Sequence, residues 1–247
     1  MSFKFIVCGV NHQAWLPRCL ESIDVQTVRD FDVAVVDDAT PDPDFRDWIK
    51  SYCEKRNWLN ILNEEHKGNM YNQVHAIRSL DCDPEDIIVF LDGDDQLAHN
   101  RVLERLLIHY SDGSEVVYGQ YVSEPFSPTC GPARPYPRDV IANNDYRHYG
   151  LHGGGLLFNH LRTIKYKLFA QLEDNDFKDQ HGNWFKSCAD AAIMIPCMEL
   201  ALGRVKCLEH EILYVYNSEN PQSDWRRQAR QVDSDHDYIL RVLKKKV

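Results

Sequence analysis

Short apolar runs alternate with helix-like segments through the first hundred residues, and this alternation constrains the fold more than any other feature of the chain. Between the runs, apolar residues recur at helical spacing, as they do over residues 15–23. The runs themselves are FKFIVCGV (3–10), DVAVVDD (32–38), LNILN (59–63) and DIIVFLD (86–92). Strands separated by amphipathic helices form a mostly parallel sheet with helices on both faces, so we predict an α/β fold of this kind.

The pattern becomes less regular after Asn100. We predict a helix around residues 102–107, and alternating strands at EVVYGQYV (115–122) and KCLEHEILYVYN (206–217). The segment EPFSPTCGPARPYPRD (124–139) carries five prolines and is typical of a long surface loop that serves as a lid or a binding loop.

Neither an internal repeat nor a low-complexity linker divides the sequence. We therefore predict a single domain over residues 1–247. It would consist of a first half (1–100), a second half (101–223) and a polar C-terminal helix (224–247).

Aspartates gather at the ends of two of the predicted strands. The second strand closes in Asp37 and Asp38, and the fourth is followed by Asp92, Asp94 and Asp95. In open α/β sheets the ligand crevice lies beyond the carboxyl ends of the strands. Because clustered like charges repel unless a cation or a set of donors offsets them, the cluster predicts a site for a positively charged group. The simpler alternative is a solvated Asp-Gly turn.

The acidic balance of the chain bears on its partners. The net charge is −10 and the pI is about 5.5, which argues against a nucleic-acid partner because such proteins carry a basic stripe. An acidic protein can still bind an anionic nucleotide where a metal ion and backbone N–H groups make the contact.

Cysteine usage and hydropathy indicate a cytoplasmic protein. The eight cysteines form no CxxC pair, and Cys8 and Cys19 lie in apolar patterns, so we expect reduced thiols and no zinc site. The opening MSFKFIVCGV is too short an apolar run for a signal peptide, and no apolar stretch approaches the roughly 18 residues that span a bilayer.

Several segments of the first half resemble, in order, those of the family 2 glycosyltransferases of GT-A fold. They are FIVCGVNHQAWLPRCLESIDVQTVRDFDVAVVDDATPD, HKGNMYNQVHAI and IVFLDGDD, the last of which is similar to the family's DxD metal motif. The resemblance implies a Rossmann-like GT-A fold and an inverting transfer of a sugar from a nucleotide-sugar donor. It also implies that residues 1–100 bind the donor and residues 101–223 bind the acceptor. It covers the first hundred residues well and the remainder loosely.

The resemblance assigns the donor site residue by residue. Asp94 and Asp95 would contact the metal, Mn²⁺ or Mg²⁺, and the ribose, with Asp92 in support. A divalent cation held by carboxylates neutralises the leaving diphosphate. Asp38 would accept a hydrogen bond from uracil, while Asp37 fixes the loop; the alternative for this pair is a turn before Thr40. The implied nucleotide-sugar-binding residues are Cys8, Gly9, Val10, Asn11, Asp38, Lys67, Gly68, Asn69, Asp92, Gly93 and Asp94.

The assignments of Val10 and Lys67 to the nucleotide site each leave a question open. Val10 departs from the aromatic or hydroxyl residue that the family often has there. Lys67 could face a phosphate or simply solvent, whereas Gly68 would permit close approach of the backbone to the nucleotide.

The resemblance also implies a general base at a helix start, where Asp190 is found. The base would take the proton of the attacking acceptor hydroxyl. Two features differ from the family: Ala189 replaces the usual acid, and Pro196 is expected to interrupt the helix. The alternative is a capping box formed by Ser187 and Asp190. Other acids that could serve are Glu173, Asp174, Asp176 and Asp179.

The remaining implied contacts lie in the second half. His152, Gly153 and Gly154 would shape the acceptor and donor-sugar pocket, unless the glycines mark a bend. His210 would be a metal ligand. Further late contacts are Asn217 and Ser223, and Trp225 with Arg226 and Arg227 would close over the diphosphate or pack the last helix. The terminal RVLKKKV (241–247) is a solvated helix end or a peripheral contact with anionic membrane.

The predicted activity is therefore transfer from a nucleotide sugar, with a UDP-sugar as the default donor, to a glycan, lipid or small-molecule acceptor. One alternative is a nucleotidyltransferase, but that class needs a Gly-rich, cation-bearing loop after strand one, and CGVNHQAWLPRC has one glycine. The other alternative is a nucleotide- or glycan-binding module that lacks catalysis.

Overall fold

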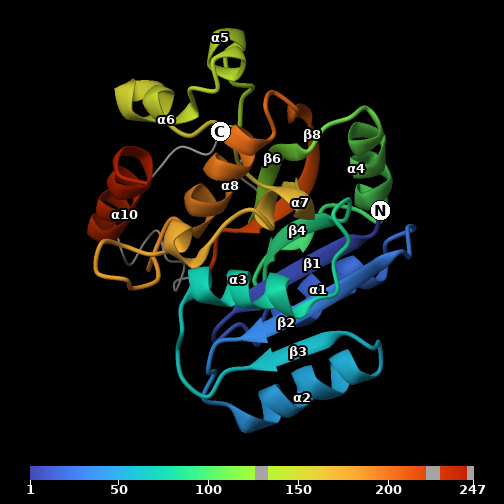
Figure 1. Ribbon diagram of the computed structural model, residues 1–247. Coiled ribbons are helices and arrows are strands. Elements are labelled where there is room, and N and C mark those ends of the chain that lie inside the picture. Colours follow the sequence, from blue (N-terminus) through green and yellow to red (C-terminus); the bar gives the residue numbers. More distant parts are fainter. Residues whose placement is uncertain (126–132, 221–228, 244–247) are drawn as a thin grey trace.

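The strands join one sheet in the order β3-β2-β1-β4-β7-β6-β8-β5 (Figure 1). This computed structural model describes residues 1–125, 133–220 and 229–243. The four strands predicted in the first half are confirmed and pair in parallel, with three helices between them. Their bounds are β1 (Phe3–Gly9), α1 (Leu16–Asp24), β2 (Phe31–Asp37), α2 (Pro43–Glu54), β3 (Leu59–Leu62), α3 (Asn69–Ser79) and β4 (Ile87–Asp92).

The strand order reverses between β1 and β4, as it does in Rossmann-like sheets. From β1 the chain moves outward through β2 to β3, and α3 then returns it to β4 on the other side of β1 (Figure 1). The carboxyl ends of β1 and β4 therefore frame the crevice where such sheets bind ligands.

The second half extends the sheet with antiparallel pairs at β4–β7, β6–β7 and β5–β8, and a parallel pair at β6–β8. The sequence did not predict β5 or β7. The elements are β5 (Gln96–Leu97), α4 (Val102–Ser111), β6 (Val116–Glu124), α5 (Arg138–Ala142), α6 (Tyr146–Tyr149), η1 (Gly150–Gly154), β7 (Arg162–Lys165), α7 (Tyr166–Phe169), η2 (Asp174–Phe177), α8 (Ala189–Leu200), β8 (Val205–Asn217) and α10 (Ala229–Arg241).

Side chains of the sheet alternate between two cores, which confirms the prediction of helices on both faces. Along β1, Phe5 and Val7 pack with α1, α2 and α4, whereas Ile6 and Cys8 pack with α3 and α8. Burial on both faces explains why the central strands are nearly continuous apolar runs. Within the described ranges, no helix combines the length and the apolar character needed to cross a bilayer.

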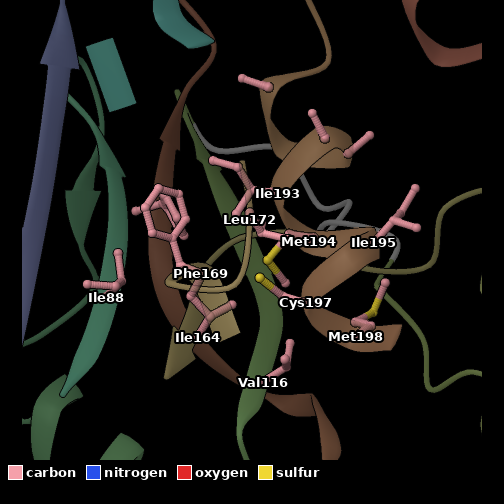
Figure 2. Close-up of a cluster of buried hydrophobic side chains, with 14 of the residues drawn as sticks. Ile88, Val116, Ile164, Phe169, Leu172, Ile193, Met194, Ile195, Cys197 and Met198 are labelled. Atoms are coloured by element: carbon pink, nitrogen blue, oxygen red, sulfur yellow. The ribbon is translucent and has the colours of Figure 1, made fainter. Parts of the chain in front are cut away.

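Helix α8 is buried on almost every side, which corrects one expectation about it. The helix continues through Pro196 to Leu200, although proline was expected to interrupt it. Ile193, Met194 and Cys197 pack against strand and loop residues of the same core (Figure 2). This packing outweighs the roughly 3 kcal/mol that proline costs in a helix interior.

Helix α10 is tied to α8 by buried polar contacts at both ends of α8. At one end, Arg147 of α6 pairs with Glu199, with 2.6 Å between Nε and Oε1, and also donates to the carbonyl of Ile239. At the other end, the backbone N–H and the hydroxyl of Ser187 both donate to Asp235, at 3.1 and 2.9 Å. The C-terminal helix therefore stabilises the segment that precedes Asp190.

The buried pair provides a test of this packing. We expect Arg147→Met to lower the free energy of unfolding by about 3–5 kcal/mol, because it leaves the fully buried Glu199 carboxylate without its cation. The double variant with Glu199→Leu should recover most of the loss. Urea unfolding measures both. Arg101→Met, which breaks an exposed pair with Glu104, should lower the free energy of unfolding far less than Arg147→Met does; equal losses from both single variants would contradict this account.

Candidate active site

The predicted donor-site residues meet at the carboxyl edge of β1, β2 and β4. Cys8 lies in register with Asp92, and the N–H of Gly93 donates to the Cys8 carbonyl at 2.9 Å. The N–H of Asp38 donates to the Gly9 carbonyl, also at 2.9 Å. Residues that lie far apart in the sequence are thus neighbours at the crevice.

A buried histidine that the sequence analysis did not identify fills the base of this crevice. The His12 side chain is 2% exposed, and its ring lies against two glycines. A Cβ on Gly9 would stand 1.9 Å from His12 Nδ1, and one on Gly93 would stand 2.4 Å from the same atom. Burial lowers the pKa of His12 to about 4, so the imidazole is neutral at pH 7. The glycine between the aspartates is therefore required by packing.

Asp95 is the most buried acid of the cluster, with 1% of its surface exposed. It accepts hydrogen bonds from the Tyr214 hydroxyl at 2.5 Å and from the Asn217 N–H at 2.6 Å. Burial, and then the charges of Asp94 and Asp92, raise its pKa well above the ordinary value. Asp94 accepts from the Asn220 side chain at 2.7 Å. Strand β8 thus supplies donors, including the predicted late contact Asn217, to the acids that follow β4.

Asp92 and Asp190 are brought together by a residue that the sequence analysis missed. Arg162, the first residue of β7, places Nη2 3.4 Å from Asp92 and Nη1 3.4 Å from Asp190. Burial disfavours the charge of Arg162, but the two carboxylates outweigh this effect and raise its pKa. The sequence carried no signal for this contact, because a basic residue in a short strand indicates exposure.

The predicted helix start at Asp190 is confirmed, and the alternative of a capping box is wrong. Cys188 is the N-cap residue of α8, and no side chain caps the helix. Ser187 donates to Asp235 instead. The Asp190 side chain is 41% exposed and accepts the Ala191 N–H at 2.8 Å, so it is held in place while one side faces solvent.

Asp190 lies beside a shallow hollow in the described structure that encloses no space large enough for a water molecule. The residues that line it are Gln73, Phe90, Arg162, Asp190, Ile193 and Met194. A reacting group would therefore approach Asp190 from its solvent-exposed side.

Three side chains present a set of possible metal ligands. Ligand atoms of Asp92, Asp95 and His160 all lie within 4.8 Å of one another. His160 stacks on Tyr214 with 4.4 Å between ring centroids, and its Nδ1 is buried without a hydrogen-bond partner among the described residues. Burial and the charge of Arg162 lower the pKa of His160 well below its ordinary value, which keeps the imidazole neutral as a ligand must be. Carboxylate oxygens with one imidazole fit Mn²⁺.

This set differs in part from the predicted metal residues Asp94, Asp95 and His210. Asp95 belongs to it, and Asp94 lies in the same turn. His210 does not join it: its side chain is 88% exposed and lies 3.5 Å from Glu209. The reason is a register shift, since Gly119 pairs with Leu208 whereas Gln120 pairs with Ile212, which leaves His210 in a bulge of β8.

Asp38 is buried and holds the loop that leads into α3. Its carboxylate accepts hydrogen bonds from the N–H groups of Lys67 and Gly68, at 2.8 and 2.9 Å, and from Asn63 at 2.9 Å. Nδ1 of the exposed His66 ring lies 2.8 Å from the same carboxylate. Burial alone would raise the pKa of Asp38, but these hydrogen bonds outweigh it and lower the pKa. The contact with His66 is the one that an N–H donor of a bound ligand could replace.

The other donor-side predictions are placed as follows. Asp37 fixes the loop as expected, because it accepts both the N–H and the hydroxyl of Thr40. The Lys67 ammonium lies 2.5 Å from Glu65. Val10, Asn11 and Asn69 lie at the ends of β1 and α3 that face the crevice, and Gly68 is the residue before α3, with a φ of 88°.

The predicted pocket segment does not lead directly into a strand. His152, Gly153 and Gly154 lie in the helical turn η1, which packs against α6 and α10. Gly153 has a φ of 88°, and a Cβ on Gly154 would stand 2.3 Å from the ring of Tyr149. The bend interpretation accounts for both glycines, and a role for the segment in the pocket stays a prediction.

The alternative bases have structural partners. Asp174 pairs with Arg78 and Lys178, Glu173 and Asp176 form a capping box at η2, and Asp179 accepts backbone N–H groups of a turn. Some predictions lie outside the described residues. They concern Ser223, Trp225, Arg226, Arg227, part of the proline-rich loop (126–132) and the last residues (244–247).

With this geometry established, the chain can be compared with known proteins. The family model described as Glycosyl transferase family 2 matches residues 5–169 of the 247. The chain belongs to glycosyl transferase family 2. The match includes the acids after β2 and β4 and also Arg162, whereas Asp190 lies beyond it. No curated protein matches the sequence.

Solved structures of S. aureus TarS share the fold. The TarS crystal structure aligns with a TM-score of 0.62 and 19% identity, over 97% of this chain and 42% of that chain. TarS 1–349 in complex with UDP-GlcNAc aligns with a TM-score of 0.61 and 18% identity, over 90% of this chain and 60% of that chain. The complex of TarS 1–349 with UDP aligns with a TM-score of 0.61 and 18% identity, over 97% of this chain and 70% of that chain. This chain thus spans about half the length of TarS, and the likeness shows that the fold is GT-A.

The packing of His12 leads to a stability prediction. We expect Gly93→Ala to lower the free energy of unfolding by about 1–3 kcal/mol, because the new methyl overlaps the buried His12 ring. His12→Ala in the same chain should remove most of this effect. Gly119→Ala is the control, since its Cβ would meet no described atom closer than 3.6 Å. Denaturant unfolding that ranks Gly93→Ala and Gly119→Ala equally would contradict the assignment.

Proposed function

We propose that the protein is a metal-dependent, inverting glycosyltransferase that uses a nucleotide sugar, with a UDP-sugar as donor. One observation carries the proposal: Arg162 forms ion pairs with both Asp92, at the end of β4, and Asp190, which lies beyond the region matched by the family. Family membership and the likeness to TarS, whose structures hold UDP and UDP-GlcNAc, support the class of donor.

The metal would be held by Asp92, Asp95 and His160, with Asp94 beside them in the same turn. A bound Mn²⁺ or Mg²⁺ supplies charge neutralisation to the leaving diphosphate. The residues fit this role because burial, and then the charges of Asp94 and Asp92, raise the pKa of Asp95 well above its ordinary value, and a divalent cation would offset both effects.

The nucleoside would lie over the edge of β1 and β2. Asp38 is ionised, and the exposed His66 ring lies 2.8 Å from its carboxylate, so a base N–H could take the place of that ring. The backbone N–H of Gly68 donates to the same carboxylate, and a Cβ added to Gly68 would meet no described atom within 4 Å, so a ligand has open space there. This arrangement supports the assignment of Asp38 to uracil.

Asp190 would be the general base. Its carboxylate is partly exposed and held by the Ala191 N–H, so an acceptor hydroxyl can approach it from solvent. In the proposed step the hydroxyl oxygen attacks C1 of the donor sugar as its proton passes to Asp190. The bond from C1 to the diphosphate breaks on the opposite side, which inverts the anomeric configuration.

Metal-dependent donor binding is the first test. We expect Asp94→Ala to abolish Mn²⁺-dependent UDP binding, and Asp95→Asn to reduce it at least about tenfold, because each removes negative charge from the proposed metal site. Calorimetry with and without EDTA measures the affinity, and thermal unfolding checks that Asp95→Asn still folds. Asp112→Asn, at an exposed helix end, is the control. Unchanged UDP affinity in Asp94→Ala would refute the site.

The base assignment has a separate test. We expect Asp190→Asn to bind UDP and Mn²⁺ with unchanged affinity and to lose at least about 100-fold in turnover, because general-base catalysis contributes 10²–10⁴-fold. Release of UDP from a panel of UDP-sugars with Mn²⁺ measures the turnover without knowledge of the acceptor. Normal turnover in this variant would move the base elsewhere. Tight UDP binding by the unmodified protein with no turnover of any donor would indicate a binding module.

A further inference from the structure

We propose that Arg162 is a positioning residue that fixes the proposed base Asp190 relative to the donor site. The inference rests on the proposed function of Asp190. It goes further because it assigns to one side chain a role in fixing the separation between the donor-site acid Asp92 and the proposed base Asp190.

The backbone of Arg162 is held in the centre of the sheet. In β7 it lies opposite Phe90 of β4 on one side and opposite Tyr118 of β6 on the other. Its side chain is 8% exposed. The guanidinium therefore projects from a rigid base and has little freedom to adopt other conformations.

Each terminal nitrogen of Arg162 serves a different carboxylate. Nη2 lies 3.4 Å from Asp92, at the end of β4, and Nη1 lies 3.4 Å from Asp190, at the start of α8. The planar guanidinium holds its nitrogens at a fixed spacing, so it ties the positions of the two acids to each other. A lysine, as a single point charge, could not contact both in this way.

The charges around Arg162 explain why such a residue is needed. Asp92, Asp94 and Asp190 would repel one another across the crevice, and the neighbouring His160 is neutral. Within the described part of the chain, the ion pairs of Asp92 and Asp190 both come from Arg162. Without this cation Asp190 would turn toward solvent, and a displacement of about 1 Å from the reacting group can cost about 10²-fold in rate.

The same reasoning predicts effects of opposite sign on two measurements. Arg162→Met removes a positive charge beside the proposed metal ligands, so the protein should bind Mn²⁺ about three- to tenfold more tightly in the presence of UDP. Turnover of the UDP-sugar that the unmodified protein hydrolyses fastest should fall about 100-fold. A residue that merely supports the fold would not raise metal affinity while lowering turnover.

The experiment is a double-mutant cycle on the full chain with Arg162→Met and Asp190→Asn. Mn²⁺ binding is followed by electron paramagnetic resonance of the free ion, turnover by UDP release, and folding by thermal unfolding. Arg46→Met is the matched control, because Arg46 of α2 also spans two carboxylates, 3.8 Å from Asp37 and 3.5 Å from Glu64, and neither Asp92 nor Asp190 is among them. Arg46→Met should not change the position of Asp190. Any effect of Arg46→Met on turnover should therefore multiply with the effect of Asp190→Asn when the two are combined.

The expected result is that the double variant turns over no more slowly than Asp190→Asn alone, since Arg162 acts through Asp190. Turnover of Arg162→Met within about threefold of the unmodified protein, or effects that multiply in the cycle, would overturn the inference. Full turnover by Asp190→Asn would instead remove the proposed base. If Arg162→Met does not fold, Arg162→Lys decides: retained charge should keep Mn²⁺ affinity within about twofold, while turnover should fall at least about tenfold.

Discussion

Repulsion among acids at the carboxyl edge of the sheet is the constraint on which the rest of this structure depends. Asp92, Asp94 and Asp95 follow one strand, and Asp95 is almost completely buried. Such a cluster is stable only where donors and cations surround it. Strand β8 supplies Tyr214 and Asn217, and β7 supplies Arg162. The second half of the chain is therefore needed to complete a site that the first half begins.

The fold brings these groups together through its strand order. The reversal between β1 and β4 opens the crevice, and β7 then pairs with β4 from the other side. Arg162 consequently lies beside the acids although 70 residues separate it from Asp92. Helix α8 presents Asp190 to the same place. Asp235 of α10 holds Ser187, which lies three residues before Asp190. Elements far from the crevice thus determine the position of a residue inside it.

The first half of the fold could be predicted because its signals are local. Apolar runs and helical spacing identified β1 to β4 and the helices between them, and the aspartates after β2 and β4 marked the edge where they meet. The strand β7 could not be identified in this way. Its sequence RTIK has two basic residues. Both are buried between β4 and β6, where Arg162 pairs with Asp92 and Asp190, and Lys165 pairs with Glu85.

The α/β class, the edge that carries the acids and the place of Asp190 at a helix start can all be read from the amino-acid sequence, because each follows from short-range pattern. Long-range packing brings His160 to the acids, leaves His210 in a bulge, places the His12 ring against Gly93, and joins Asp92 to Asp190 through Arg162. These contacts depend on strand register and on pairing between distant segments. Neither the register nor the pairing can be inferred from the spacing of residues within a short stretch of sequence.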